Sequence, residues 1–394
     1  MNPVSRKKSY PLSVGSKAIP ELSNGVKAVV AMSGGVDSSV AAYLLKQKGF
    51  AVTGLSFELW DQRDRKNPAV CCSAETIEIA KDVARRLGIE HYTSDVRDEF
   101  FKHIIENFCN SYLSGATPNP CILCNKFIKF NFLLKKAQEV GAEVIATGHY
   151  ARIVRSEELR VKSLELRDKD PAHITHYPLL LKGIDPKKDQ SYVLYVMTPG
   201  QLAKTEFPLG ELRKEDTRAI AKGLGLTNAL RAESQEICFI GNGNYVDFIK
   251  GIAPDSLKPG PVVNTRMKII GEHKGIAFYT IGQRKRLGVS SLKPLYVIDI
   301  NRQDNTIVAG SKEEAFKNIF NVRELNWISA EPPSGPFRAN VQVRSTMKEE
   351  PATIFPLENQ VVKVEFDELQ WAPAKGQSAV FYIGEQVIGG GIIE

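Results

Sequence analysis

The chain has 394 residues, more than one ordinary hydrophobic core holds, so we expect two or three domains. Its 43% hydrophobic and 25% charged residues are typical of a globular protein, and no apolar run reaches the roughly 18 residues that a membrane helix needs. A net charge of +7 permits a polyanionic partner, and six cysteines in so long a chain exclude a disulfide scaffold and favour thiols in a reducing cytoplasm.

Residues 1–25 form a basic extension that we expect to be disordered. The first 20 residues carry four cations, no acid and several serines, which faintly resembles an organelle-targeting segment. Pro3, Pro11 and Pro20 oppose the amphipathic helix of such a segment. A tail is therefore the favoured interpretation, and a targeting segment is the alternative.

From Val26 to about Gly148 the pattern alternates between apolar strands and amphipathic helices. The strand candidates are Val26–Ala31, Ala51–Phe57 and Glu143–Thr147. Helical periodicity appears in Ser38–Lys48, Ser73–Leu87, Asp98–Ser111 and Ile128–Val140. This alternation predicts βαβ units, a largely parallel sheet and a Rossmann-like α/β domain.

The rest of the chain changes character twice. Residues 155–185 are rich in charge and predict an irregular excursion, whereas Lys214–Leu224 predict a helix. From Asn244 onward, short β-rich runs predict a small central β-rich domain and a C-terminal β-barrel; they are Pro294–Ile300, Thr306–Val308, Ala339–Val343, Gln360–Phe366 and Ser378–Tyr382. After the extension we therefore divide the chain into residues 26–243, 244–303 and 304–394.

The stretch SGGVDS, residues 33–38, joins the first predicted strand to the first predicted helix. Its glycines allow close approach of a ligand, and the free N–H groups of a helix start favour phosphate. Asp37 suits such a site if it holds Mg²⁺ on the phosphates. The stretch is neither a Walker loop nor a dinucleotide fingerprint, and a plain strand–helix turn is the alternative. It resembles the PP loop of the ATP pyrophosphatase superfamily, which implies cleavage of ATP to AMP and pyrophosphate.

Three cysteines are candidates for sulfur chemistry. Cys121 and Cys124 lie in TPNPCILCNKFIKF, and Cys238 lies in ESQEICFIG. Two lysines follow Cys124 at the start of a basic helix, which favours a thiolate, the nucleophile of sulfur transfer. Half a zinc site and a thioredoxin-type dithiol are alternatives. Buried inert thiols are a further alternative, chiefly for Cys109 and less so for Cys71 and Cys72.

Seven stretches then occur in a family-like order: GGVDSSVAAYLL, TPNPCILCNKFIKF, ATGHYARI, KDQSYVLY, ICFIG, GEHKGIAFYTIGQRKRLGV and GQSAVFY. Together they resemble the bacterial and organellar tRNA-specific 2-thiouridylases over about residues 26–394, apart from the irregular excursion at 155–180. The resemblance implies ATP-dependent 2-thiolation of the wobble uridine (position 34) of tRNA, by adenylation of its O2 and sulfur transfer from a cysteine persulfide. It gives Cys238 the persulfide and Cys124 the role of partner nucleophile.

The resemblance also implies two sets of binding residues. For ATP they are Ala31, Met32, Ser33, Gly34, Gly35, Val36, Asp37, Ser38, Phe57 and Gly148. For tRNA they are Asn119, Pro120, Cys121, His149, Lys188, Asp189, Gln190, Arg344, Ser345 and Gln377. Phe57 fits equally well as a core residue. For His149, the alternative is a capped histidine in a loop. The chain departs from part of the family at Cys121, where an acidic residue is common, and at Ser345, where a basic or aromatic residue is common.

A cationic cluster adds a signal that does not depend on the family. The run GQRKRLG, residues 282–288, gathers three cations that suit contacts to tRNA phosphates, with a solvated charged face as the alternative. The partners we expect are tRNAs with Lys, Glu and Gln type anticodons and a persulfide sulfur-donor protein. We expect a cytoplasmic monomer and no membrane contact.

Three other functions stay open at this point. The first is an iron–sulfur-dependent tRNA thiolase, with Cys121, Cys124 and Cys238 as ligands of a 4Fe-4S cluster. The second is an ATP-pyrophosphatase-type synthetase, which needs no paired cysteines. The third is an RNA-binding protein with a relict nucleotide loop.

Overall fold

The computed structural model describes residues 25–59, 74–155, 178–229, 231, 237–240, 244–254, 257–328 and 332–394. The predicted N-terminal tail, Cys71 and Cys72, and most of the predicted excursion at 155–185 lie outside the described residues. Among the described helices, none is both long and apolar enough to span a bilayer.

The first domain is built on a parallel five-stranded sheet with the order β3-β2-β1-β4-β7. The strands are β1 (Lys27–Ala31), β2 (Ala51–Glu58), β3 (Glu90–Asp95), β4 (Val144–Ala146) and β7 (Thr205–Glu206). The three central strands were predicted, whereas the edge strands β3 and β7 were not. β3 is polar and mostly exposed and β7 has only two residues, so neither carries an apolar signal.

Helices cover both faces of this sheet. Helices α1 (Val36–Gln47), α2 (Ala74–Leu87) and α9 (Lys214–Gly223) share one apolar cluster with Val30 of β1. Helices α4 (Glu106–Leu113) and α6 (Phe130–Glu139) share the other with Val29. Because neighbouring residues of β1 face opposite buried clusters, the strand is apolar from Ala28 to Ala31.

Two of the predicted helices are interrupted by π-helical turns. The first divides into α3 (Arg97–Phe100), η1 (Phe101–Ile105) and α4. The second begins earlier than predicted, as α5 (Pro120–Leu123) followed by η2 (Cys124–Lys129) and α6. Such turns are frequent at functional sites, and η2 begins at a cysteine of the predicted active site.

The middle of the chain forms a separate mixed sheet with the order β10-β11-β8-β9. Helix α10 (Tyr245–Ile252) precedes its strands, which are β8 (Gly260–Asn264), β9 (Ile269–His273), β10 (Tyr296–Asn301) and β11 (Thr306–Gly310). β11 runs parallel to β8 and antiparallel to β10. The hairpin of β10 and β11 therefore straddles the predicted boundary after residue 303.

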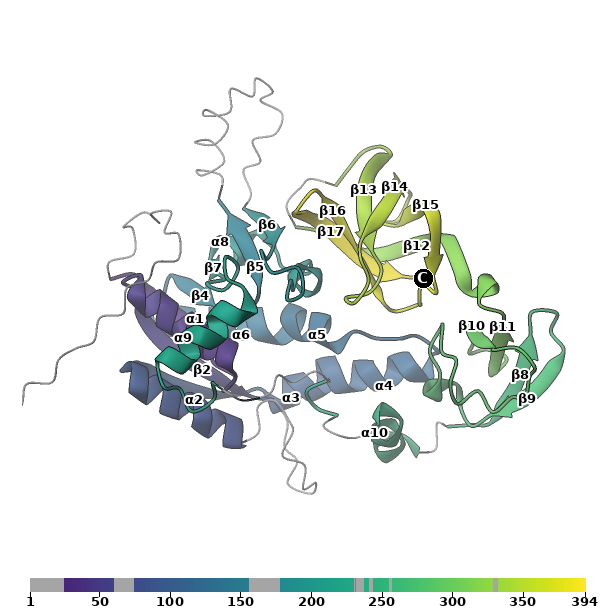
Figure 1. Ribbon diagram of the computed structural model, residues 1–394, viewed down its shortest axis with the longest axis horizontal. Coiled ribbons are helices and arrows are strands. Elements are labelled where there is room, and N and C mark those ends of the chain that lie inside the picture. Colours follow the sequence, from purple (N-terminus) through teal and green to yellow (C-terminus); the bar gives the residue numbers. More distant parts are fainter. Residues whose placement is uncertain are drawn as a thin grey trace, which may run out of the picture.

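The C-terminal region is a closed six-stranded antiparallel barrel, shown in yellow and yellow-green in Figure 1. Its strands are β12 (Phe316–Trp327), β13 (Phe337–Gln342), β14 (Glu350–Pro356), β15 (Val362–Trp371), β16 (Ser378–Ile383) and β17 (Gln386–Ile393). The order β12-β15-β14-β13-β16-β17 closes because β12 also pairs with β17. The predicted fold class, an α/β domain with a central β-rich domain and a C-terminal β-barrel, is thus confirmed.

A hairpin of the first domain extends the barrel sheet. β5 (Ala151–Val154) pairs with β6 (Leu179–Lys182), and β6 pairs in turn with β17. The prediction of an irregular 155–185 segment was therefore wrong for Leu179–Lys182, a four-residue strand whose partner β17 lies far along the chain. The barrel and the α/β domain consequently share main-chain hydrogen bonds.

Candidate active site

The PP loop, residues 33–38, lies between the carboxyl end of β1 and the start of α1. Its hydroxyls bind its own backbone: Ser38 Oγ donates to the Gly35 carbonyl at 3.0 Å and accepts from Ser33 N at 3.2 Å. Ser33 stays exposed and Gly35 half-buried at the N-terminus of a 12-residue helix. A preshaped loop of this kind offers backbone N–H groups to a phosphate.

Two glycines let other elements reach this loop. Gly34 has φ of +74°, and a Cβ on it would lie 2.2 Å from the Thr76 carbonyl oxygen of α2. Gly148 follows β4, and a Cβ there would lie 2.7 Å from Ser38 N and from the Asp37 carbonyl carbon. The structure thus brings Gly148, predicted to bind ATP, directly against the PP loop.

Asp37 is held by residues from two distant segments. Lys214 Nζ of α9 lies 2.7 and 2.8 Å from its two carboxylate oxygens, and the Tyr150 hydroxyl donates to it at 2.9 Å. Only 8% of Lys214 is exposed, so this ion pair is largely shielded from water. The ammonium of Lys214, at the start of the predicted helix Lys214–Leu224, thus faces the nucleotide loop.

Magnesium fits this loop only with ATP present. Within the described ranges, no three His, Cys, Asp or Glu side chains gather to hold a metal ion. Mg²⁺ commonly takes one or two carboxylates and completes its shell with phosphates and water. Asp37 would be the protein ligand, and Lys214 would have to yield part of its contact.

Phe57 lies at the end of β2, inside the same apolar cluster as Val29 and Leu55. It is 7% exposed. Packing in this cluster is enough to explain a phenylalanine at position 57. Contact of Phe57 with adenine stays a prediction.

The cysteine loop, Thr117–Asn125, contains α5 and the first turn of η2. Asn119 caps α5 by accepting from Ile122 N, and Pro120 occupies the first turn. Cys121 is exposed, whereas Cys124 is buried. The side-chain amide of Asn125 donates to the Val193 carbonyl at 2.9 Å. The far side of the loop is thereby tied to another segment.

Cys124 and Cys238 contribute to one apolar cluster of the α/β domain, Cys124 as a buried member and Cys238 packed against it. Both are thiols rather than disulfides, as are Cys109 and Cys121. Burial raises the pKa of the Cys109 thiol to about 11, which fits the inert role expected for it. Cys121 is exposed, Cys124 is buried, and the described residues contain no metal-binding triplet. The three cysteines therefore do not fit an iron–sulfur cluster in this arrangement.

His149 directly follows Gly148, the glycine that contacts the PP loop, and is buried. Its Nδ1 lies 2.6 Å from the Thr147 hydroxyl, and its ring packs near Phe130 and Phe207. Burial, assisted by the charge of Lys129, holds the pKa of His149 well below its usual value. Its imidazole is therefore neutral at physiological pH.

Comparison with known protein families finds three matches, which together run from residue 26 to residue 393 with short gaps. Residues 26–242 match the tRNA methyl transferase HUP domain, 246–311 its PRC-barrel domain, and 317–393 the aminomethyltransferase beta-barrel domain. The tRNA-specific 2-thiouridylase MnmA of Clostridioides difficile (strain 630) is 43% identical over 359 residues, 91% of this chain and 95% of that protein. The MnmA 2 protein of Thermoanaerobacter sp. (strain X514) is 46% identical over 361 residues with the same coverage. The chain belongs to the tRNA-specific 2-thiouridylase family.

Solved structures resemble this chain less than the relatives above do. An NMN synthetase from Francisella tularensis superposes with a TM-score of 0.31 and 17% identity, covering 59% of this chain and 78% of that chain. An overlap of that size carries no inference.

Several residues that the 2-thiouridylase resemblance assigns to tRNA are engaged within the protein here. The Asp189 carboxylate accepts from Gly183 N at 2.9 Å and from the Ser191 hydroxyl at 2.8 Å, and the Gln190 side chain accepts from Tyr150 N at 3.0 Å. Lys188 is half-buried and Ser345 is exposed.

Two further residues of the predicted tRNA-binding set, Arg344 and Gln377, form hydrogen bonds across domain boundaries. Arg344 of the barrel donates to the Ile281 carbonyl of the middle domain at 3.2 Å. Gln377 donates to the Thr117 and Pro118 carbonyls at 2.9 and 3.3 Å. Both side chains therefore join two domains.

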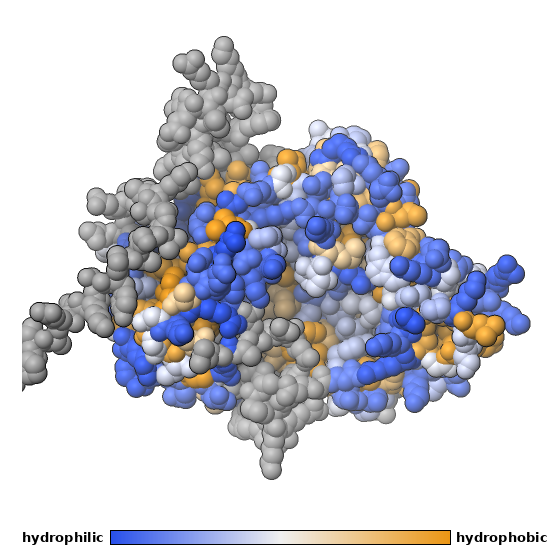
Figure 2. Space-filling model, in the orientation of Figure 1, coloured by the Kyte–Doolittle hydropathy of each residue, from blue (hydrophilic) through white to orange (hydrophobic). Residues whose placement is uncertain are grey.

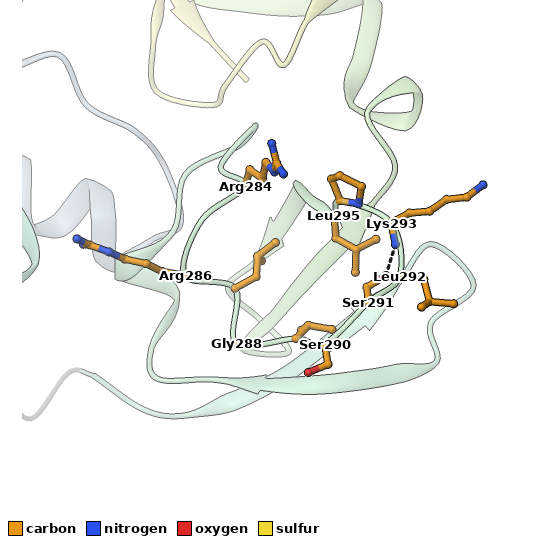
Figure 3. Close-up of a pocket in the computed structure, with 11 residues that line it drawn as sticks. Arg284, Arg286, Gly288, Ser290, Ser291, Leu292, Lys293 and Leu295 are labelled. Atoms are coloured by element: carbon orange, nitrogen blue, oxygen red, sulfur yellow. Dashed lines mark hydrogen bonds between the residues drawn. The ribbon is translucent and has the colours of Figure 1, made fainter.

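The cationic run of the middle domain borders a cavity of about 500 Å³ lined by residues 284 and 286–295. Figure 3 shows Arg284, Arg286 and Lys293 extending from it in different directions. The face of the protein seen in Figure 2 is mainly hydrophilic, with apolar residues in separate patches. Spread cations of this kind suit a phosphate backbone better than a compact anion.

Sequence reasoning missed three residues that shape the nucleotide site. Lys214 and Tyr150 hold Asp37, and the side-chain amide of Asn228 donates to the Gly34 carbonyl and to the Ser39 hydroxyl, both at 2.9 Å. Asn228 lies 194 positions from Gly34, so no local pattern reveals the contact. Tyr150 alone had a signal, because it stands in the ATGHYARI stretch.

Proposed function

We propose that this chain catalyses ATP-dependent 2-thiolation of the wobble uridine, position 34, of tRNA. The supporting observation is that one α/β domain carries both an intact PP loop and the cysteine pair, in a chain aligned over 91% of its length with 2-thiouridylases. A synthetase would need the loop but no cysteine pair.

The first step activates the uridine. A carbonyl oxygen is a poor leaving group, so attack of O2 on the α-phosphate of ATP converts it into an adenylate and releases pyrophosphate. The exposed rim of the PP loop binds the phosphates through its N–H groups. Mg²⁺ on Asp37 would neutralise charge that develops on the phosphates.

The second step delivers sulfur. Cys238 carries a persulfide from a donor protein, and the Cys124 thiolate attacks the Cys238 sulfur, closing a disulfide and releasing hydrosulfide. Hydrosulfide attacks C2 of the adenylate, and AMP leaves with the former O2. The transferred sulfur gains two electrons and the two cysteines lose two, so a dithiol reductant must restore them each turnover.

The tRNA contacts belong to the same proposal. To the predicted tRNA-binding residues we add the cations around the middle-domain cavity, which are Arg284, Arg286 and Lys293. They would bind tRNA phosphates. Arg344 and Gln377 reach tRNA only if they release the protein carbonyls that they bind here. The expected substrates remain tRNAs with Lys, Glu and Gln type anticodons.

The remaining expectations stand as proposals. We propose a persulfide donor protein as partner, a monomeric state, and a cytoplasmic location in which the thiols stay reduced. We also propose that the middle domain continues through β11, because that strand pairs with β8 and β10, so that the barrel begins after Gly310.

Reconstitution tests this function. Purified protein, tRNA, ATP with Mg²⁺, a protein persulfide donor and a dithiol reductant should yield 2-thiouridine at position 34 with one AMP per thiolation, measured by nucleoside mass spectrometry. Cys238→Ser should abolish thiolation and leave tRNA affinity unchanged. Thiolation by Cys238→Ser, or AMP release that needs ammonia or an amino acid in place of a sulfur donor, would refute it.

A further inference from the structure

The C-terminal barrel contacts the cysteine loop through one short segment, the barrel turn Lys375–Ser378, which leads into β16. Thr117 N donates to the Lys375 carbonyl at 2.7 Å. The Gln377 amide donates back to the carbonyls of Thr117 and Pro118. These bonds fix the entry of the cysteine loop.

The approach is close enough to require glycine. Gly376 has φ of +84°, and a Cβ on it would lie 2.9 Å from Ala116 Cβ and 3.1 Å from both N and O of Thr117. Any side chain would therefore push the barrel turn away from the loop.

The same barrel turn supports the far side of the cysteine loop through η4 (Ser191–Leu194). The Ser378 carbonyl accepts from the Tyr192 hydroxyl at 2.8 Å, and the Ser378 hydroxyl lies 3.0 Å from that of Tyr195. Between these tyrosines, the Val193 carbonyl holds Asn125. Asn125 and Tyr192 are 1% and 2% exposed, so these bonds are protected from water.

We propose that the barrel turn Lys375–Ser378 positions the cysteine loop for sulfur transfer, with Gly376 and Gln377 as positioning residues. The inference rests on the proposed function and deepens it. Helix α5 has only four residues, so it depends on outside contacts for its shape. Cys124 follows it directly, and a displacement of about 1 Å at a reacting group lowers a rate about 100-fold.

The experiment compares matched variants of the full chain. Gly376→Ala and Gln377→Glu disturb the contact, and Gly384→Ala is the control because Gly384 also has positive φ, +59°, but nothing within 4 Å of its Cβ position. We expect the two test variants to lower kcat for thiolation by about 10- to 100-fold, with KM for ATP within about 2-fold of wild type. Kd for tRNA should stay within about 2-fold of wild type for Gly376→Ala, because Gly376 is not one of the predicted tRNA-binding residues. The control should keep wild-type kinetics.

A second readout follows the thiols themselves. Cys124 and Cys109 are both buried, at 6% and 4% exposure. Peptide mapping after timed iodoacetamide treatment should show faster alkylation of Cys124 in both test variants, by about 10-fold, with Cys109 unchanged, because only the loop is released. The control should alkylate as wild type does.

Three results would overturn the inference. The first is a rise of tRNA Kd in Gly376→Ala that matches its loss of activity, which would make the barrel turn a tRNA contact only. The second is equal acceleration of Cys109 alkylation, which would indicate general destabilisation. The third is unchanged kcat and unchanged alkylation of Cys124. Should wild type fail to thiolate tRNA while the alkylation contrast holds, the proposed function fails and the positioning role stands.

Discussion

At the residue scale, the Lys214–Asp37 pair shows how the nucleotide loop is held before ATP binds. The Lys214 ammonium contacts both oxygens of a carboxylate that is 31% exposed. Removing one partner of a shielded pair leaves the other charge poorly solvated.

We therefore expect Lys214→Met to lower the free energy of unfolding by about 2 kcal/mol, less than for a fully buried pair because Asp37 keeps some water. Asp37→Asn combined with Lys214→Met should recover most of that loss. Urea unfolding of the two single variants and the double variant measures this coupling, and additive losses would show that the pair contributes nothing.

His149 gives a pH prediction at the same scale. Its folded pKa is lowered, so the unfolded chain binds the proton more readily, and the stabilising effect is present above the unfolded pKa and lost as pH falls. Because the unfolded pKa is near 6.5 and the folded pKa is lowered, His149 should reduce the stability of the folded protein as pH falls from neutral to 5.5.

The variant His149→Asn, which does not titrate at this position, should lose less stability than wild type over that pH range. Urea unfolding at both pH values checks it. His91 and His273 also have lowered pKa values, but they remain in both proteins and cancel in the comparison. Parallel pH profiles would contradict the assignment.

At the scale of elements, the site depends on a close contact between the segment after β4 and the loop between β1 and α1. Gly148 lies against the Asp37–Ser38 peptide with no room for a methyl group. Backbone atoms form the obstacle, so the loop itself must shift when a side chain is added.

Gly148→Ala should therefore lower ATP-dependent pyrophosphate release by at least about 10-fold and destabilise the fold by about 1–3 kcal/mol. Gly223→Ala, in α9 with open space around its Cβ position, should keep the activity and leave stability equal or higher. Pyrophosphate release and thermal unfolding test both variants, and equal activity of the two would sink this explanation.

At the scale of the whole molecule, the domains share their cores. Val380, Tyr382 and Val387 of the barrel belong to the same apolar cluster as Phe108 and Leu133 of the α/β domain. The middle-domain cluster likewise includes Ala372 and Ala374 from the barrel. Figure 1 shows the barrel beside the β5–β6 hairpin that extends its sheet.

Such shared burial couples the units, so we expect one cooperative thermal transition, seen together by calorimetry and by far-UV circular dichroism. Deletion of residues 312–394 should expose the shared cluster and yield a chain that binds a hydrophobic dye or aggregates. Two separated transitions in the full chain would indicate independent domains instead.

Much of this molecule was predictable because the signals were local. The central strands β1, β2 and β4 follow from apolar runs, and the PP loop follows from the glycines and serines after the first of them. The fold class and the family follow from ordered motifs. Polar β3 and two-residue β7 were missed because an edge strand need not be apolar on both faces.

The sequence by itself determined the family, the α/β-plus-barrel fold class and which chemical groups the site contains, because these depend on short patterns of residue types. Only the tertiary structure decided the partners of those groups: Lys214 on Asp37, Gln377 on the cysteine loop, and a buried His149. Each of these contacts joins residues far apart in sequence or depends on packing from several elements. Hydrogen bonding and burial of that kind arise only after the chain has folded.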